Sequence, residues 1–196
     1  MTTLPSIAQI EQLHRKYART SEELDLVFQH CQIVQEIAKQ LIKANQTLDI
    51  NADLVQVGCL LHDIGVYIVL ATPGTPYIRH GVLGGNILTK EGFPEEISRF
   101  ASCHTGVGLS RAEIVSSSLP LPAQDFFART REERLVMYAD KFHSKTNPPK
   151  FNKLSSYRKQ ATQFGVDNVA RLDALVREFG IPDLVPLVAK YKQEIK

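Results

Sequence analysis

The sequence of 196 residues has few cysteines, no strong excess of either charge and no internal repeat. Cys31, Cys59 and Cys103 are far apart, and without a CxxC pair they favour neither a disulfide framework nor a zinc knuckle. We expect them to pack as small apolar residues in a protein of the reducing cytoplasm. The formal net charge is only +2, so a nucleic-acid duplex or a polybasic membrane arm is not indicated.

Membrane and secretion signals are also weak. Residues 1–17 lack the apolar core of a secretion signal, which is typical of a mature protein. The most apolar stretch, residues 54–71, contains His62, Asp63 and Gly65, and a polar pair near the middle of a membrane span is costly. We predict a buried core segment ending in a helix stop at Gly65, with no membrane as a partner.

The composition that remains is that of a soluble helical domain. Hydrophobic residues make up 43% of the chain and charged residues 22%. Apolar residues recur at three- and four-residue spacing, and no convincing period-two strand is present. A capping pattern marks four helix starts, at Thr20, Asn51, Ser110 and Thr130. The sequence predicts an all-α single domain over residues 1–196, with a helical bundle over about 24–146 and a helical C-terminal extension over about 151–196.

Four polar residues of this predicted bundle need an explanation. His30 borders the buried face of its helix, His62 and Asp63 end the most buried helix, and Asp140 shares the inward side of Val136. Buried carboxylates are normally paired or bound to a metal. Two histidines and two aspartates suit a transition metal, and they leave coordination positions open for water and substrate.

These residues resemble a known family in order and approximate spacing. His30, the adjacent pair His62–Asp63 and Asp140 match the HD-domain phosphohydrolase superfamily, and LLHDIG at 60–65 resembles the hallmark of its HDIG subgroup. The resemblance covers roughly residues 24–146. It implies a helical fold and a metal-dependent enzyme that hydrolyses a phosphate ester or anhydride, with a nucleotide as the expected substrate.

Two further segments resemble those that supply a second metal site in this family. HGVLGGNIL at 80–88 contributes His80, and CHTGVG at 103–108 contributes His104. The resemblance implies that Asp63 bridges two ions, that His30, His62 and Asp140 complete the first site, and that His80 and His104 hold the second. The alternatives are a helix cap for His80 and a helix-dipole contact for His104.

The cyclic-dinucleotide phosphodiesterase branch of the family differs from this chain. Cys103–His104 stands where that branch has paired histidines, and its GYP triplet is absent. These departures count against cyclic-di-GMP as the substrate.

The segment ADKFHSK at 139–145 resembles the ADK segment of small family members that act on nucleotides. The resemblance implies a phosphate contact and a catalytic role for Lys141 beside Asp63. Lys145 and Arg79 are further candidates for substrate binding. His14 and His143 are expected to be solvated.

The expected cofactor is one or two divalent ions, Mn, Fe, Co or Ni, with Mg or Zn as compatible alternatives. We predict that metal-activated water attacks phosphorus without a covalent enzyme intermediate. Two other functions fit the same ligands: a di-iron oxygenase and a non-catalytic nucleotide-binding module. A homodimer is compatible with the sequence.

Overall fold

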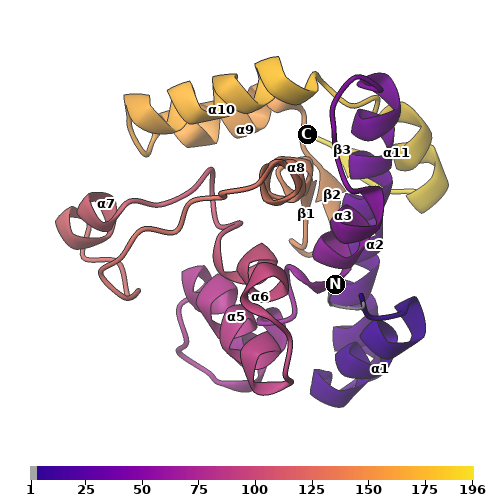
Figure 1. Cartoon of the computed structure of the whole chain (residues 1–196), viewed down its shortest axis with the longest axis vertical. Coiled ribbons are helices and arrows are strands. Elements are labelled where there is room, and N and C mark those ends of the chain that lie inside the picture. Colours follow the sequence, from indigo (N-terminus) through magenta and orange to yellow (C-terminus); the bar gives the residue numbers. More distant parts are fainter. Residues whose placement is uncertain (1–3) are drawn as a thin grey trace.

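The computed structural model describes residues 4–196 and is mainly α-helical, which confirms the predicted fold class (Figure 1). The helices are α1 Ile7–Tyr17, α2 Ser21–Ala44, α3 Ala52–Leu61, α4 Val66–Ala71, the 3₁₀ helix η1 Tyr77–Arg79, α5 His80–Lys90, α6 Glu95–Ser102, α7 Arg111–Ser116, α8 Arg131–Asp140, α9 Leu154–Thr162, α10 Val166–Phe179 and α11 Val185–Tyr191. The division into a bundle and a C-terminal extension stays a prediction.

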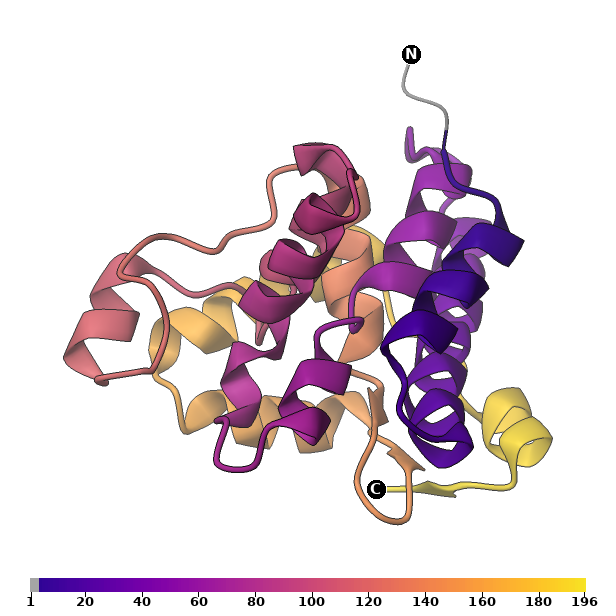
Figure 2. The ribbon, with the colours of Figure 1, turned by 90° about the horizontal axis from the view of Figure 1, so that it is seen from below.

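The centre of the fold is the apolar helix α3, which packs against α2, α6 and α8. The stretch Ala52–Ala71 has the length and composition of a membrane span, but 72% of its most apolar window is buried inside the protein. Burial in the core accounts for this composition. The segment around α7 projects from one side of the bundle in both views (Figures 1 and 2).

All four predicted caps are present. The side-chain oxygen of each capping residue accepts the backbone N–H three positions later: Thr20, Asn51, Ser110 and Thr130. Of the acidic residues three positions after Thr20, Ser110 and Thr130, only Glu113 completes the reciprocal bond of a capping box. Glu23 pairs with Arg19 instead, and Glu133 pairs with Arg99 at 2.8 Å. The pattern therefore located the helix starts, although the acidic residue often bonds elsewhere.

Three two-residue strands form a small sheet that the sequence did not indicate: β1 His143–Ser144, β2 Lys150–Phe151 and β3 Glu194–Ile195. β2 pairs antiparallel with β1 and parallel with β3. Two residues are too few to show a period-two pattern. The sheet brings residues near 193 next to the segment that follows α8.

Gly65 does not end a helix in the way that was predicted. Its φ of −72° and ψ of −13° are right-handed, and α4 begins at the next residue. A Cβ at this position would lie 2.0 Å from the carbonyl oxygen of His80 and 2.3 Å from the amide nitrogen of Gly84. Glycine is therefore needed for the close approach of the α3–α4 turn to α5.

His14 is buried, contrary to the expectation that it is solvated. Its Nε2–H donates to the carbonyl oxygen of Leu60 at 2.7 Å, and its Nδ1 accepts from the hydroxyl of Tyr67 at 2.9 Å. Burial lowers the pKa of His14 to about 4, which keeps the ring neutral. The apolar stripe of α1 did not reveal that α3 and α4 also cover the flank of the helix that carries His14.

Candidate metal centre

The structure brings His30, His62, Asp63 and Asp140 together, as predicted. They come from α2, the end of α3, the following turn and the last residue of α8. The Nε2 atom of His30 lies 3.0 Å from Oδ2 of Asp63 and 3.0 Å from Oδ1 of Asp140. It lies 3.2 Å from Nε2 of His62. The ligand atoms of this first set all lie within 4.8 Å of one another, which suits a metal ion.

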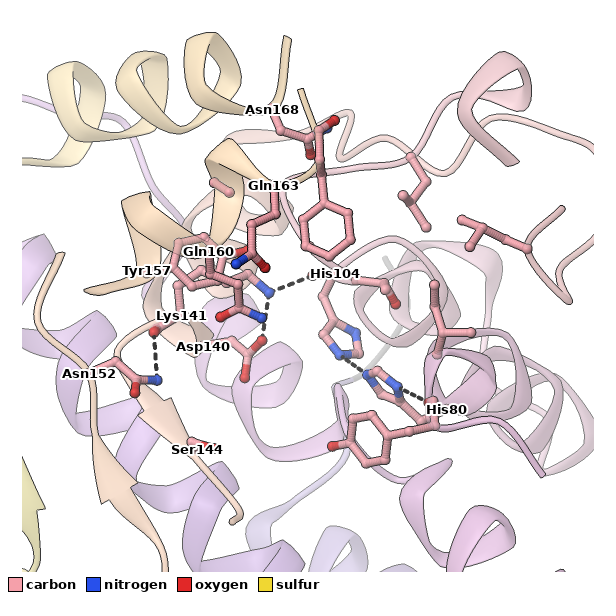
Figure 3. A pocket seen from close by; sticks show the side chains of 18 of the residues that line it. His80, His104, Asp140, Lys141, Ser144, Asn152, Tyr157, Gln160, Gln163 and Asn168 are labelled. Carbon is pink, nitrogen blue, oxygen red and sulfur yellow. Dashed lines mark hydrogen bonds and ion pairs between the residues drawn. The ribbon is translucent and has the colours of Figure 1, made fainter. Parts of the chain in front are cut away.

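A second set shares Asp63 with the first. His80 begins α5 and His104 follows α6, and their Nε2 atoms are 2.9 Å apart. Each Nε2 lies 3.5 Å from Oδ1 of Asp63. Figure 3 shows the two imidazole rings with these nitrogens directed toward each other. The carboxylate thus has one oxygen toward each set, the arrangement expected of a bridging ligand.

Local hydrogen bonds fix the tautomers of three histidines. In each, Nδ1 lies 2.7 Å from the carbonyl oxygen three residues earlier: His62 on Cys59, His80 on Tyr77 and His104 on Ala101. A carbonyl oxygen only accepts, so Nδ1 carries a proton and Nε2 points its lone pair inward. Metal-binding histidines are commonly oriented in this way.

The electrostatics of the second set favour a cation. Burial lowers the pKa of His80 to about 4 and also lowers the pKa of His104, so both rings are neutral near pH 7. The Oδ1 atom of Asp63 is buried and has no hydrogen-bond partner among residues 4–196. The Nε2 lone pairs of His80 and His104 and the Oδ1 atom of Asp63 therefore face one another with no hydrogen-bond donor between them. This arrangement of three acceptors is unfavourable. A divalent ion satisfies all three acceptors, so the residues present fit a metal.

In the first set a proton competes with a metal. Burial lowers the pKa of His62, but Asp63, Cys31 and Asp140 together outweigh this, and the pKa lies well above 6.5. Burial likewise raises the pKa of Asp63, but Lys145 and His62 hold it well below 3.8. A proton on Nε2 of His62 and a metal ion use the same lone pair. Affinity of this set for metal is therefore expected to rise with pH.

His143 supports His30, although a solvated position was expected for it. It is 5% exposed, its Nδ1 lies 2.8 Å from Nδ1 of His30, and its Nε2 lies 2.7 Å from Oε1 of Gln193. The amide nitrogen of Gln193 faces Oε1 of Gln29 at 3.4 Å, so the amide oxygen faces His143. His143 then donates through Nε2 and accepts from Nδ1 of His30. This leaves the Nε2 lone pair of His30 free for the metal site.

The three basic candidates are placed differently. Lys141 is buried and donates to Oδ2 of Asp140 at 2.7 Å and to the carbonyl oxygen of His104 at 2.9 Å. Lys145 pairs with Oδ2 of Asp63. Arg79 is exposed and does not line the cavity at this site, so the structure does not bring it to the metal centre.

A cavity of about 660 Å³ opens beside the two ligand sets. Asp63, His80, His104 and Asp140 line one end, together with both lysines. Residues of α7, α9 and α10 are among those that line the remainder. This volume is in the range of small-molecule sites.

A family model described as the HD domain matches residues 27–145. An uncharacterized protein of Methanocaldococcus jannaschii is 38% identical over 116 residues, covering 58% of this chain and 64% of that protein. A tRNA (cytidine(56)-2'-O)-methyltransferase of Thermoplasma volcanium is 32% identical over 149 residues, covering 76% of this chain and 41% of that protein. The chain thus spans less than two thirds of the length of either relative.

A solved structure also has a similar fold. The HD domain of the L. monocytogenes phosphodiesterase PgpH, in complex with cyclic-di-AMP, superposes with a TM-score of 0.51 over 95% of this chain and 99% of that chain. Sequence identity is 15%, so this likeness concerns the fold alone.

Proposed function

Because the chain belongs to the HD domain family, we propose that it is a metal-dependent phosphohydrolase that cleaves a phosphate ester or anhydride of a nucleotide. The observation that carries this proposal is that the two carboxylate oxygens of Asp63 face different ligand sets. Its Oδ2 faces His30, and its unpartnered Oδ1 faces two neutral histidines. One buried carboxylate between two sets of inward lone pairs is suited to two cations.

His30, His62 and Asp140 would hold one ion with Asp63, and His80 and His104 would hold the other. When bound, such ions would lower the pKa of water to about 7 and polarise a phosphoryl oxygen. Imidazole and carboxylate ligands suit Mn²⁺, Fe²⁺, Co²⁺ and Ni²⁺, with Mg²⁺ and Zn²⁺ as alternatives.

The two lysines supply cationic donors for a phosphate group. Burial lowers the pKa of Lys141, but Asp140, Tyr157 and Asp63 together outweigh this and raise it above 10.5. In the same way Asp63, Tyr77 and Asp140 together outweigh the effect of burial on Lys145 and raise its pKa. Both ammonium groups are therefore charged at neutral pH beside the ligand sets. Charged donors to phosphate oxygens form strong hydrogen bonds.

A covalent enzyme intermediate is not favoured. Cys103 precedes His104, but burial raises the pKa of its thiol and it does not line the cavity. A protonated thiol is a poor nucleophile. Attack by water on phosphorus is therefore the simpler reaction.

A nucleotide is proposed as the substrate class. The structural neighbour was solved with cyclic-di-AMP, a nucleotide, and this supports the same class here. The cytoplasmic location and the homodimer stay predictions.

Metal analysis followed by a phosphate-release screen tests the proposal. The protein is purified anaerobically, and nucleotides are incubated with Mn²⁺, Co²⁺, Ni²⁺ or Fe²⁺ in ¹⁸O-water. We expect metal-dependent hydrolysis with one ¹⁸O atom entering the phosphoryl product. Oxygen uptake with an iron EPR signal and no hydrolysis would instead establish the di-iron oxygenase. Nucleotide binding without turnover with every metal would indicate a binding module.

Gln193→Leu is expected to weaken binding of the first metal ion by about tenfold, the lower end of effects for groups that orient a ligand. The substitution removes the acceptor that holds the tautomer of His143 and, through it, that of His30. Gln193→Glu keeps an acceptor oxygen and should retain wild-type affinity within about twofold. Competition with a chromophoric chelator for Co²⁺ measures both. Equal losses in the two variants would show that Gln193 acts only through packing.

A further inference from the structure

One wall of the cavity is built by α9 and the start of α10. These helices lie beyond residue 145, where the family match ends. Tyr157, Gln160, Ala161 and Phe164 line the cavity at the spacing of one helical face, together with Gln163. We call Tyr157, Gln160, Gln163 and Phe164 the amide face. These residues therefore lie outside the part of the chain that the family model matches.

Charge is distributed unevenly along the cavity. Among the described lining residues, Lys141 and Lys145 are the only lysines or arginines, and both lie at the metal end. The far wall carries the carboxylate of Glu113. Ser110 and Arg171 outweigh the effect of burial and lower the pKa of Glu113 to about 2, so this group is ionised. Glu113 forms an ion pair with Arg171, so the described residues of this wall supply no unpaired positive charge for a second anionic group of a ligand.

The amide face offers neutral hydrogen-bonding groups instead. Figure 3 shows the amides of Gln160, on α9, and Gln163, which follows α9, among the side chains that line the cavity. Neither side chain forms a hydrogen bond within the part of the chain that the structure describes. Each amide presents one acceptor and two donors, which can pair with the edge of a heterocycle. Tyr157 and the exposed Phe164 offer aromatic surfaces on which a base can stack.

We propose that the amide face binds the base of a nucleoside monophosphate whose single phosphate lies at the metal centre. The position of the phosphate in this inference rests on the proposed function, whereas the position of the base does not. A polyphosphate chain would need cationic groups farther along the cavity, where the described lining residues include no lysine or arginine. In the reaction, water forms a bond to phosphorus, the ester P–O bond breaks, and the nucleoside leaves with a proton, giving inorganic phosphate.

The test compares nucleoside 5′-monophosphates with ribose 5-phosphate, which lacks a base. In the Gln160→Leu/Gln163→Leu variant, kcat/KM for the preferred monophosphate should fall about 10- to 100-fold through KM, as expected for two lost hydrogen bonds. Hydrolysis of ribose 5-phosphate should stay within about twofold. Gln32→Leu makes the same chemical change on the exposed side of α2, outside the cavity, and should have no effect.

Binding measured by calorimetry separates this inference from the proposed function. The wild-type protein should bind its preferred nucleoside monophosphate more tightly than ribose 5-phosphate, and the double variant should lose this difference even if no phosphate is released. Equal losses for both ligands, or preference for a triphosphate or a dinucleoside polyphosphate, would overturn the inference. Base-dependent binding without hydrolysis under any metal would overturn the proposed function and leave the base site standing.

Discussion

Asp63→Asn is expected to reduce phosphate release by about 10³-fold or more. The substitution keeps the shape of the side chain but removes the charge shared by the two ligand sets. An amide presents one oxygen, so its NH₂ group would face one of the sets with donors instead of an acceptor. Loss of several kcal/mol of transition-state charge stabilisation corresponds to this factor. The measurements are kcat/KM with Mn²⁺ and the number of ions bound per chain.

Asp53→Asn provides the matched control. Asp53 is exposed in the first turn of α3, and the same chemical change there should leave activity within about twofold, as for most surface substitutions. Thermal unfolding of both variants checks that the fold is retained. Full activity with two bound ions in Asp63→Asn would contradict the bridging role.

Gly65→Ala is expected to lower the free energy of unfolding by about 3 kcal/mol, the upper end for overpacking. The added methyl group would meet backbone atoms of His80 and Gly84, which cannot rotate away as a side chain can. Relief requires movement of α5, and α5 carries His80. We therefore expect loss of the second ion together with the loss of stability. Urea unfolding and metal analysis measure the two effects.

Gly85→Ala on α5 is the comparison. Its Cβ would meet the side chain of Ser102 at 3.0 Å, a contact that a small adjustment can relieve. Alanine also favours a helix over glycine by about 1 kcal/mol, so the net change in stability should be near zero. If Gly65→Ala keeps wild-type stability and two bound ions, the prediction is wrong. The α3–α4 turn and α5 can then move apart without a loss in the free energy of unfolding.

The first ligand set could be located from the sequence because local patterns carry it. His30 and Asp140 stand at helical spacing from apolar residues, and His62–Asp63 follow the most apolar run. Each helix buries its apolar face in the same core, so the polar residues at the border of those faces meet. The structure places all four together. Their metal-binding role stays a prediction.

Other features depend on tertiary contacts that no local pattern reveals. Gln193 reaches His143 because β3 pairs with β2, and strands of two residues leave no signal in a sequence. The sequence predicted a helix stop at Gly65, because a glycine after an apolar helix is a common helix end. The close packing of α5 against Gly65 is a tertiary contact that the neighbouring residues do not indicate. Arg79 lies next to His80 in sequence but is exposed, since adjacent residues on a helix point in different directions.

The sheet that holds Gln193 also sets an order of assembly during protein synthesis. A ribosome delivers His30, His62, Asp140 and His143 before it delivers β3, so the acceptor that fixes the ring of His143 arrives last. In a partly synthesised chain the packing of the helices can already bring the ligand residues together. The hydrogen bond that fixes the tautomer of His143, and through it that of His30, has not yet formed. We therefore expect the centre to reach its full metal affinity only once β3 pairs with β2, after the helices that carry its ligands have been synthesised.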